Sequence, residues 1–96
     1  MEKSAAYYFG QALAIIDQAT PGGLSAATIN KAMALPGLHF GRLIRDAQKH
    51  MTPELDQEMA DVVNHVSDWP HSLTLVQQGD CQLGMAHMRQ QLEGRS

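Results

Sequence analysis

Apolar residues recur at helical spacing through most of this 96-residue chain, and no segment alternates apolar and polar residues over a useful length. Breaks rich in proline and glycine at residues 20–23, 35–37 and 69–70 separate the helical patterns. Because a half-buried strand needs the period-two alternation that is missing here, the sequence predicts an all-α fold. We expect one domain over residues 1–96, a compact bundle of about five helices.

The start of each predicted helix, except the third, is marked by a residue that can accept a hydrogen bond from the first helical turn. These expected N-caps are Ser4, Ser25, Thr52 and Thr74. The helices are expected at about 5–19, 26–34, 38–51, 53–66 and 75–92. The last is the longest, and Gln77, three residues after Thr74, completes a capping box. Trp69-Pro70 stops the preceding helix and leads into this segment.

The last helix carries apolar residues on two sides, at 100° per residue. One stripe contains Leu75, Gly79, Leu83 and Ala86, with Val76 beside it; the second contains Cys81, Met85, Met88 and Leu92. Such a helix is either central in the bundle or packs on its own domain with one stripe and on a partner with the other. Both interpretations stay open, and the second stripe is the candidate subunit interface.

The third helix has a basic ridge formed by Arg42, Arg45 and Lys49, which fall within about one sixth of the helix circumference. His39 and His50 lie at its margin. Such a ridge can contact a row of phosphates without reading bases, although charges at helical spacing also form ordinary solvated surfaces. The expected nucleic-acid backbone contacts are Arg42, Arg45, Lys49, His39 and, on the last helix, Arg89.

The fourth helix has an acidic ridge formed by Glu54, Glu58 and Asp61. Acids near its start are favoured by the positive end of the helix dipole, and this is a sufficient structural explanation. A functional alternative is that the acidic ridge meets the basic ridge of a second copy, in a head-to-tail contact. The three acids are therefore added to the candidate subunit interface.

Composition and spacing argue against several classes of protein. The net charge of −3 does not suit a globally basic nucleic-acid binder. A single cysteine excludes an internal disulfide and fits a reducing compartment, so we expect a cytoplasmic protein without a membrane span. The five histidines lack metal-ligand spacing, and Cys81 lies on an apolar stripe where an inert thiol is expected. We expect no catalytic residues, no metal, no cofactor and no small-molecule substrate.

The tail from Trp69 to Gln91, with Gln78-Gly79, Leu83-Gly84 and His87 to Gln90, resembles the closing segment of the large subunit of type I-C CRISPR Cascade. Tyr7 to Ala14 looks like the opening helix of that C-terminal region, and Pro36 to Arg45 looks like its middle helix. Where the family has aromatic residues after Leu-Gly and after Gln-Gly-x, this chain has Met85-Ala86 and Cys81. These replacements favour contacts made by charge or packing over base stacking.

In type I-C systems the small subunit is made from an internal start within the large-subunit frame, and a 96-residue chain covering only this region looks like such a subunit. The resemblance implies a non-catalytic protein that lines the belly of the complex in more than one copy. Its implied partners are the backbone and large subunits, a second copy of itself, crRNA and target DNA. Two alternatives remain: an acidic helical adaptor or inhibitor without a nucleic-acid role, and a small enzyme with a pocket at His39, His50 or His65.

Overall fold

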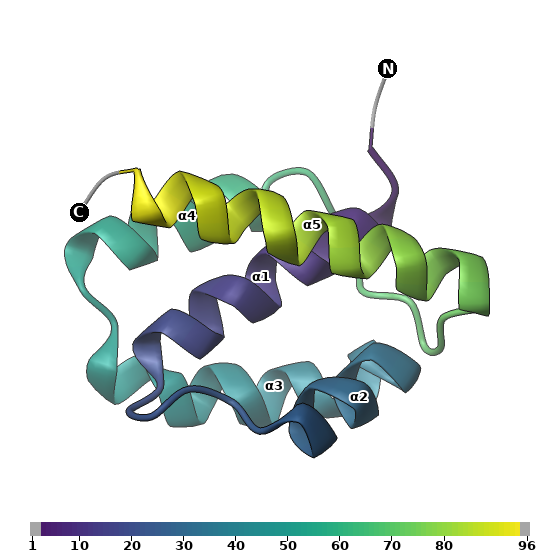
Figure 1. The fold of residues 1–96 in the computed structure, drawn as a ribbon, viewed down its shortest axis with the longest axis horizontal. Coiled ribbons are helices and arrows are strands. Elements are labelled where there is room, and N and C mark those ends of the chain that lie inside the picture. Colours follow the sequence, from purple (N-terminus) through teal and green to yellow (C-terminus); the bar gives the residue numbers. More distant parts are fainter. Residues whose placement is uncertain (1–2, 95–96) are drawn as a thin grey trace.

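The computed structural model describes residues 3–94, which form five α-helices, one short 3-10 helix and no strand (Figure 1). The helices are α1 (Ala5–Ala19), α2 (Ala26–Ala34), α3 (Pro36–Ala47), α4 (Pro53–Val63) and α5 (Leu75–Glu93), and the 3-10 helix spans Gln48–His50. The all-α bundle of about five helices expected from the sequence is confirmed.

The four expected N-caps all accept a hydrogen bond from the first turn of their helix. Ser4, Ser25, Thr52 and Thr74 receive backbone N–H groups at 3.1 to 3.2 Å. At α5 the capping box is complete, because the backbone N–H of Thr74 also donates to Gln77 Oε1 at 2.9 Å. The serines and threonines therefore fix where these four helices begin.

The third helix differs from the expectation at both ends. It begins at Pro36, directly after Leu35, because proline at the first helical position lacks only an N–H that would have no helical partner there. Its last turn tightens into the 3-10 helix Gln48–His50. The fourth helix also ends earlier than the apolar pattern suggested, at Val63.

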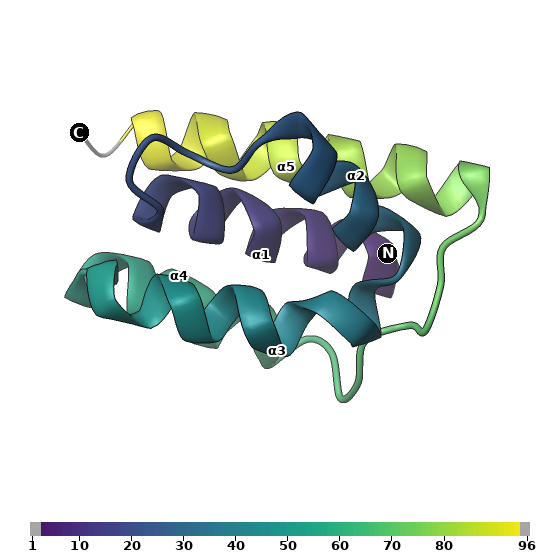
Figure 2. The same cartoon turned by 90° about the horizontal axis from the view of Figure 1, so that it is seen from below.

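The central element of the bundle is α1, not the last helix. Ten of its fifteen residues are buried, among them Phe9, Leu13, Ile15 and Ile16, which are wholly inaccessible. Figure 2 shows α1 between α5 on one side and the α3–α4 pair on the other. A helix that is apolar almost all round needs neighbours on several sides, and α1 has them.

The closest helix contact joins α1 to α5, which run in the same direction (Figure 1). A Cβ atom built on Gly10 would overlap the carbonyl group of Cys81, and one built on Gly84 would overlap the carbonyl group of Tyr7. Each helix thus presents a glycine to the other's backbone, so the two backbones approach more closely than side chains would allow.

This close contact decides which stripe of α5 is buried. Cys81, Met85 and Met88 lie in the core and Leu92 packs against it, whereas Leu75, Val76 and Leu83 are exposed. The expectation that the stripe of Cys81 faces a neighbouring subunit is therefore wrong. Gly84 sits on that side of the helix and brings it against α1, so the stripe of Cys81 becomes the core.

The segment between α4 and α5 closes the far side of the core. Trp69 packs against Phe9 and Phe40, with ring centroids 5.2 and 5.0 Å away. The backbone N–H of Gly37 donates to the Pro70 carbonyl at 3.0 Å, which ties this segment to the start of α3. The loop thereby holds α3 in place and fixes the direction in which its outer face points.

Candidate nucleic-acid interface

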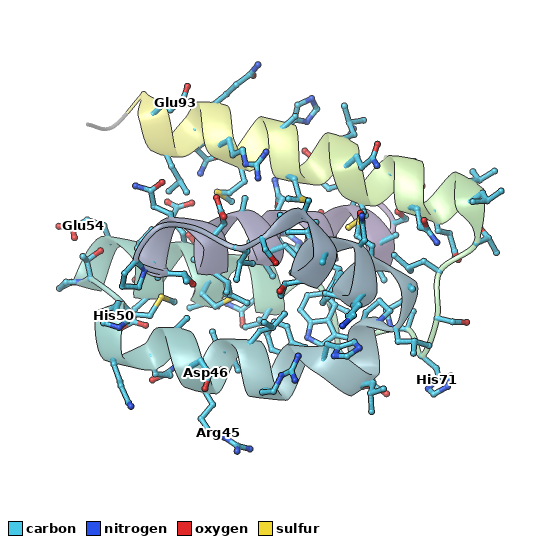
Figure 3. The ribbon with its side chains drawn as sticks, turned by 60° about the horizontal axis from the view of Figure 1, so that its bottom comes forward. Arg45, Asp46, His50, Glu54, His71 and Glu93 are labelled. Carbon is cyan, nitrogen blue, oxygen red and sulfur yellow. The ribbon has the colours of Figure 1, made fainter. Side chains whose placement is uncertain are left out.

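The outer face of α3 carries the basic ridge, and the packing of the opposite face explains its exposure. Leu43 and Ala47 are buried, and Phe40 and Ile44 pack against the core. Arg42, Arg45 and Lys49 project from the other side and are exposed. Figure 3 shows Arg45 pointing away from the bundle into open space. The structure thus places these three predicted residues together on one accessible surface.

The three cations of this ridge are not neutralised within the part of the chain that the structure describes. Across residues 3–94, the single ion pair joins Arg89 to Asp17 and involves none of them. Asp46 lies next to Arg45 on the same outer side of α3 (Figure 3), a neighbour that the ridge pattern left out. The face therefore carries a net charge of about two positive units.

His39 and His50 flank the ridge at its two ends. His39 is half-buried, and its Nδ1 lies 3.5 Å from Arg42 Nη2, a distance at which the guanidinium can donate only a weak hydrogen bond. His50 ends the 3-10 helix and is exposed. His39 thus extends the ridge towards the start of α3.

Two further residues on this face are visible only in the structure. Leu38 is 64% exposed, and Gly41 has no atom within 4 Å of the position that a Cβ would occupy. Both fall on the helix face of Arg45. A glycine in an exposed helix interior costs about 0.5–1 kcal/mol relative to alanine. Open backbone beside three cations is a surface on which a phosphate chain can approach closely.

Arg89 lies apart from this ridge. It stands on α5, and its Nη2 is 3.8 Å from Asp17 Oδ2. Asp17 Oδ1 accepts the backbone N–H of Leu24 at 2.6 Å, so the carboxylate also holds the turn that follows α1. The structure does not bring Arg89 together with Arg42, Arg45 and Lys49.

The acidic ridge on α4 loses one of its three members to the interior. Glu54 and Asp61 are exposed, but Glu58 is only 3% exposed and accepts a 2.6 Å hydrogen bond from Gln91 Nε2. The expectation that Glu58 belongs to an exposed interface is wrong. Its position on the helix wheel lies at the margin of the buried stripe, and α5 covers that margin.

A cavity of about 130 Å³ lies between α1, α4 and α5, where His65 stacks on Tyr8 with a centroid separation of 4.6 Å. Glu58 and Asp61 also line it. His65 is one of the three histidines considered for an enzyme, and it shares this cavity with the two acids. Glu58 accepts a hydrogen bond from Gln91, and Asp61 accepts one from Gln57.

A second cavity, of about 240 Å³, lies between α2 and α5. Its lining is mainly apolar and includes Ile29, Met33 and Met85 together with Arg89. Arg89 is the residue that pairs with Asp17.

Cys81 is fully buried, and its burial raises the pKa of the thiol to about 12. A thiol that stays protonated is a poor nucleophile. Within residues 3–94, no three His, Cys, Asp or Glu side chains are grouped so that they could hold a metal ion. No helix in that range is long and apolar enough to cross a membrane.

Three segments far apart in the sequence pack against one another: the opening segment Tyr7 to Ala14, the middle segment Pro36 to Arg45 and the tail Trp69 to Gln91. The opening segment meets the tail where Gly84 contacts the Tyr7 carbonyl and where the Tyr7 hydroxyl and His87 Nδ1 share a 2.7 Å hydrogen bond. The middle segment meets it where Gly37 donates to Pro70. These residues therefore hold the bundle together, whereas the ridge residues Arg42 and Arg45 do not.

No family model matches this chain, and no curated protein does.

Proposed function

We propose that this chain is the non-catalytic small subunit of a type I-C CRISPR Cascade complex in the cytoplasm. It lines the belly of the complex and supports crRNA-guided binding of target DNA through contacts to the sugar-phosphate backbone. The observation that carries the proposal is the exposed ridge of Arg42, Arg45 and Lys49 on a helix face turned away from the core. The resemblance of three segments, in the same order along the chain, supports the assignment to this complex.

The chemistry of the ridge fits a contact that does not depend on base sequence. Guanidinium and ammonium groups bind phosphate oxygens, and among the residues described no Phe, Tyr or Trp ring lies on this face for base stacking. In guide-directed recognition, base pairing supplies the sequence information, and protein contacts to the backbone tip a nearly balanced exchange of strands. A ridge of three cations supplies such a contact without any selectivity for sequence.

The direct test of the assignment is co-purification. The chain is expressed with the other subunits and a crRNA of a type I-C system, and the complex is isolated through a tag on the backbone subunit. We expect stoichiometric co-elution, and weaker binding of target DNA by the complex prepared without this chain. Absence of the chain from the purified complex would refute the assignment.

The ridge itself is tested by the triple variant R42A/R45A/K49A within the assembled complex. We expect the variant to fold and assemble, and to bind target DNA more weakly. The slope of log affinity against log salt concentration should become shallower, by an amount that corresponds to the loss of up to about three phosphate contacts. The control is K31A, which removes an exposed cation of α2 from outside the ridge and should leave the salt slope unchanged. An unchanged slope in the triple variant would show that the ridge does not contact the DNA backbone.

A substitution at Gly41 provides a second test of the same contact. Replacing it with alanine should raise the stability of the free chain by about 0.5–1 kcal/mol, because the position is an open helix interior. If a phosphate chain lies against this face, the same variant should bind DNA more weakly within the complex. Equal DNA affinity would show that the backbone at Gly41 is not approached.

An acidic adaptor without a nucleic-acid role is the second candidate, and the exposed apolar residues Leu75, Val76 and Leu83 favour it. An adaptor of this kind would not need the basic ridge to bind its protein partners. If the chain binds protein partners with no dependence on salt, and R42A/R45A/K49A binds them as well as the unaltered chain, the adaptor replaces the Cascade subunit as the proposal.

A further inference from the structure

The groove between α2 and α5 is the larger of the two cavities described above, with a volume of about 240 Å³. It is left open because α2 packs mainly on α3 (Figure 1) and touches α5 at few points. The turn that leads into α2 is held by Asp17, whose Oδ1 accepts the backbone N–H of Leu24 at 2.6 Å. The separation of the two helices therefore follows from how the chain enters α2.

The inner part of this groove is apolar and continuous with the core. Met33 and Met85 are each 5% exposed, and Ile29 packs against the core. Apolar side chains that line an open space lack van der Waals partners on that side, so an apolar group that enters the groove gains contacts there. The flexible thioether chains of the two methionines can adjust to its shape.

The size of the groove limits what it can hold. Ala26 of α2 and Ala86 of α5 also line it, and both are exposed, so short side chains leave it open to solvent. A cavity of about 150 Å³ holds benzene, so the 240 Å³ of this groove accommodate about ten non-hydrogen atoms. The groove is thus suited to a small molecule.

The polar side chains of the groove all carry N–H donors. They are Asn30, Gln82 and Arg89, and Arg89 is the one charged residue of the lining. No side-chain hydrogen bond to another residue of the range 3–94 engages any of the three. Arg89 Nη2 is 3.8 Å from Asp17 Oδ2, which is longer than a hydrogen bond. An anion in the groove would therefore meet available donors and one positive charge.

The charge of the lining favours a carboxylate over a phosphate. A guanidinium binds a carboxylate through two parallel hydrogen bonds, and the single negative charge of that group matches one arginine. A phosphate monoester brings about 1.5 to 2 negative charges to the same cation. The lining includes no Asp, Glu, His, Cys or Lys that could serve as acid, base or nucleophile, so the groove is suited to binding and not to reaction.

We propose that the groove between α2 and α5 binds a small carboxylic acid. Its aromatic or aliphatic body lies against Met33 and Met85, and its carboxylate contacts Arg89. The inference does not depend on the proposed nucleic-acid role, because the groove shares no residue with the basic ridge of α3. A ligand of about ten atoms in an open groove binds weakly, and we expect a Kd of about 0.1–1 mM.

Phenylacetate is a probe of the required size, and phenylacetamide is its uncharged counterpart. Titration of the isotope-labelled chain by NMR should give saturable shifts of the backbone amide signals of Ile29 and Met85. The variant R89Q should bind phenylacetate about three- to tenfold more weakly, because a charge-assisted hydrogen bond is lost, and phenylacetamide with nearly unchanged affinity. The control K31Q removes an exposed cation of α2 outside the lining and should leave both affinities unchanged.

The variant A86L tests the location of the ligand, because a larger side chain at this exposed position fills the groove without entering the core. We expect it to lose phenylacetate binding, whereas A27L, at an exposed alanine of α2 outside the lining, should keep it. Circular dichroism checks that each variant folds. No saturable shift at concentrations about tenfold above the expected Kd overturns the proposal, as do equal losses of acid and amide in R89Q, unchanged binding of phenylacetate by R89Q, or binding that persists in A86L.

Discussion

Glycines in the helix interiors serve opposite purposes, depending on what stands beside them. Gly10 and Gly84 lie at the crossing of α1 and α5, where each faces a backbone carbonyl group of the other helix. Gly41 and Gly79 face open space. The sequence alone does not separate these pairs, because the difference lies in the neighbouring helix and not in the local pattern.

Substituting these glycines with alanine should change stability in opposite directions. G10A and G84A should each lower the free energy of unfolding by at least about 2 kcal/mol, because the added methyl group must push two helix backbones apart. G79A should raise it by about 0.5–1 kcal/mol, since only the conformational cost of glycine is removed. Urea titrations at low protein concentration measure all three. Similar losses in G79A and G84A would contradict the close crossing.

Cys81 should make the stability of the chain fall at alkaline pH. Its folded-state pKa is raised to about 12, so above about pH 9 the unfolded chain releases this proton and the folded chain does not. Unfolding is therefore favoured progressively as pH rises. The stability advantage of the native chain over C81A should be constant near neutral pH and shrink by about 1 kcal/mol between about pH 9 and pH 10. A difference that is independent of pH would show that the folded thiol ionises normally.

At the scale of the helix, α5 shows why hydrophobicity is an insufficient guide to burial. Both of its stripes are apolar, but the one with Leu75 and Leu83 is outside and the one with Cys81 and Met88 is inside. The Trp69 segment, by contrast, holds α3 on the core through Phe9 and Phe40.

Alanine variants of Trp69 and Leu83 should separate these two roles. W69A should cost about 2–3 kcal/mol of stability, because a large ring leaves a contact with two other aromatic residues. L83A should change the stability of the monomer by less than about 0.5 kcal/mol, since the side chain is half exposed. Urea midpoints decide, and a large loss in L83A would place that residue in the core after all.

For the whole molecule, the sequence predicted the number of helices and the four side-chain N-caps, because both depend on local chemistry at residues such as Ser4 and Thr74. It also predicted the exposed ridge, because the apolar residues buried on the opposite face belong to the same helix as Arg42 and Arg45. It could not predict that α1 is central, or that Glu58 is covered by Gln91, because these depend on which helices meet.

Charge is divided unequally over the assembled bundle. α4 carries Glu54, Asp56, Glu58 and Asp61 without a basic residue, whereas α3 and the 3-10 helix after it carry three cations and Asp46. Figure 3 shows Arg45 and Glu54 on different sides of the molecule. A negative total charge and a basic contact surface are therefore compatible, because local potential and not net charge decides where phosphate binds.

The pairing of α1 with α5 also sets the order of events during synthesis. Its contacts join residues 76 and 80 positions apart, so the ribosome has made α1 long before its main partner exists. Until then the nascent chain displays the apolar side of α1, and the slow closure of this long loop delays folding. The domain therefore acquires its native core only after the last helix has emerged, and the apolar surface that is exposed until then is prone to aggregation.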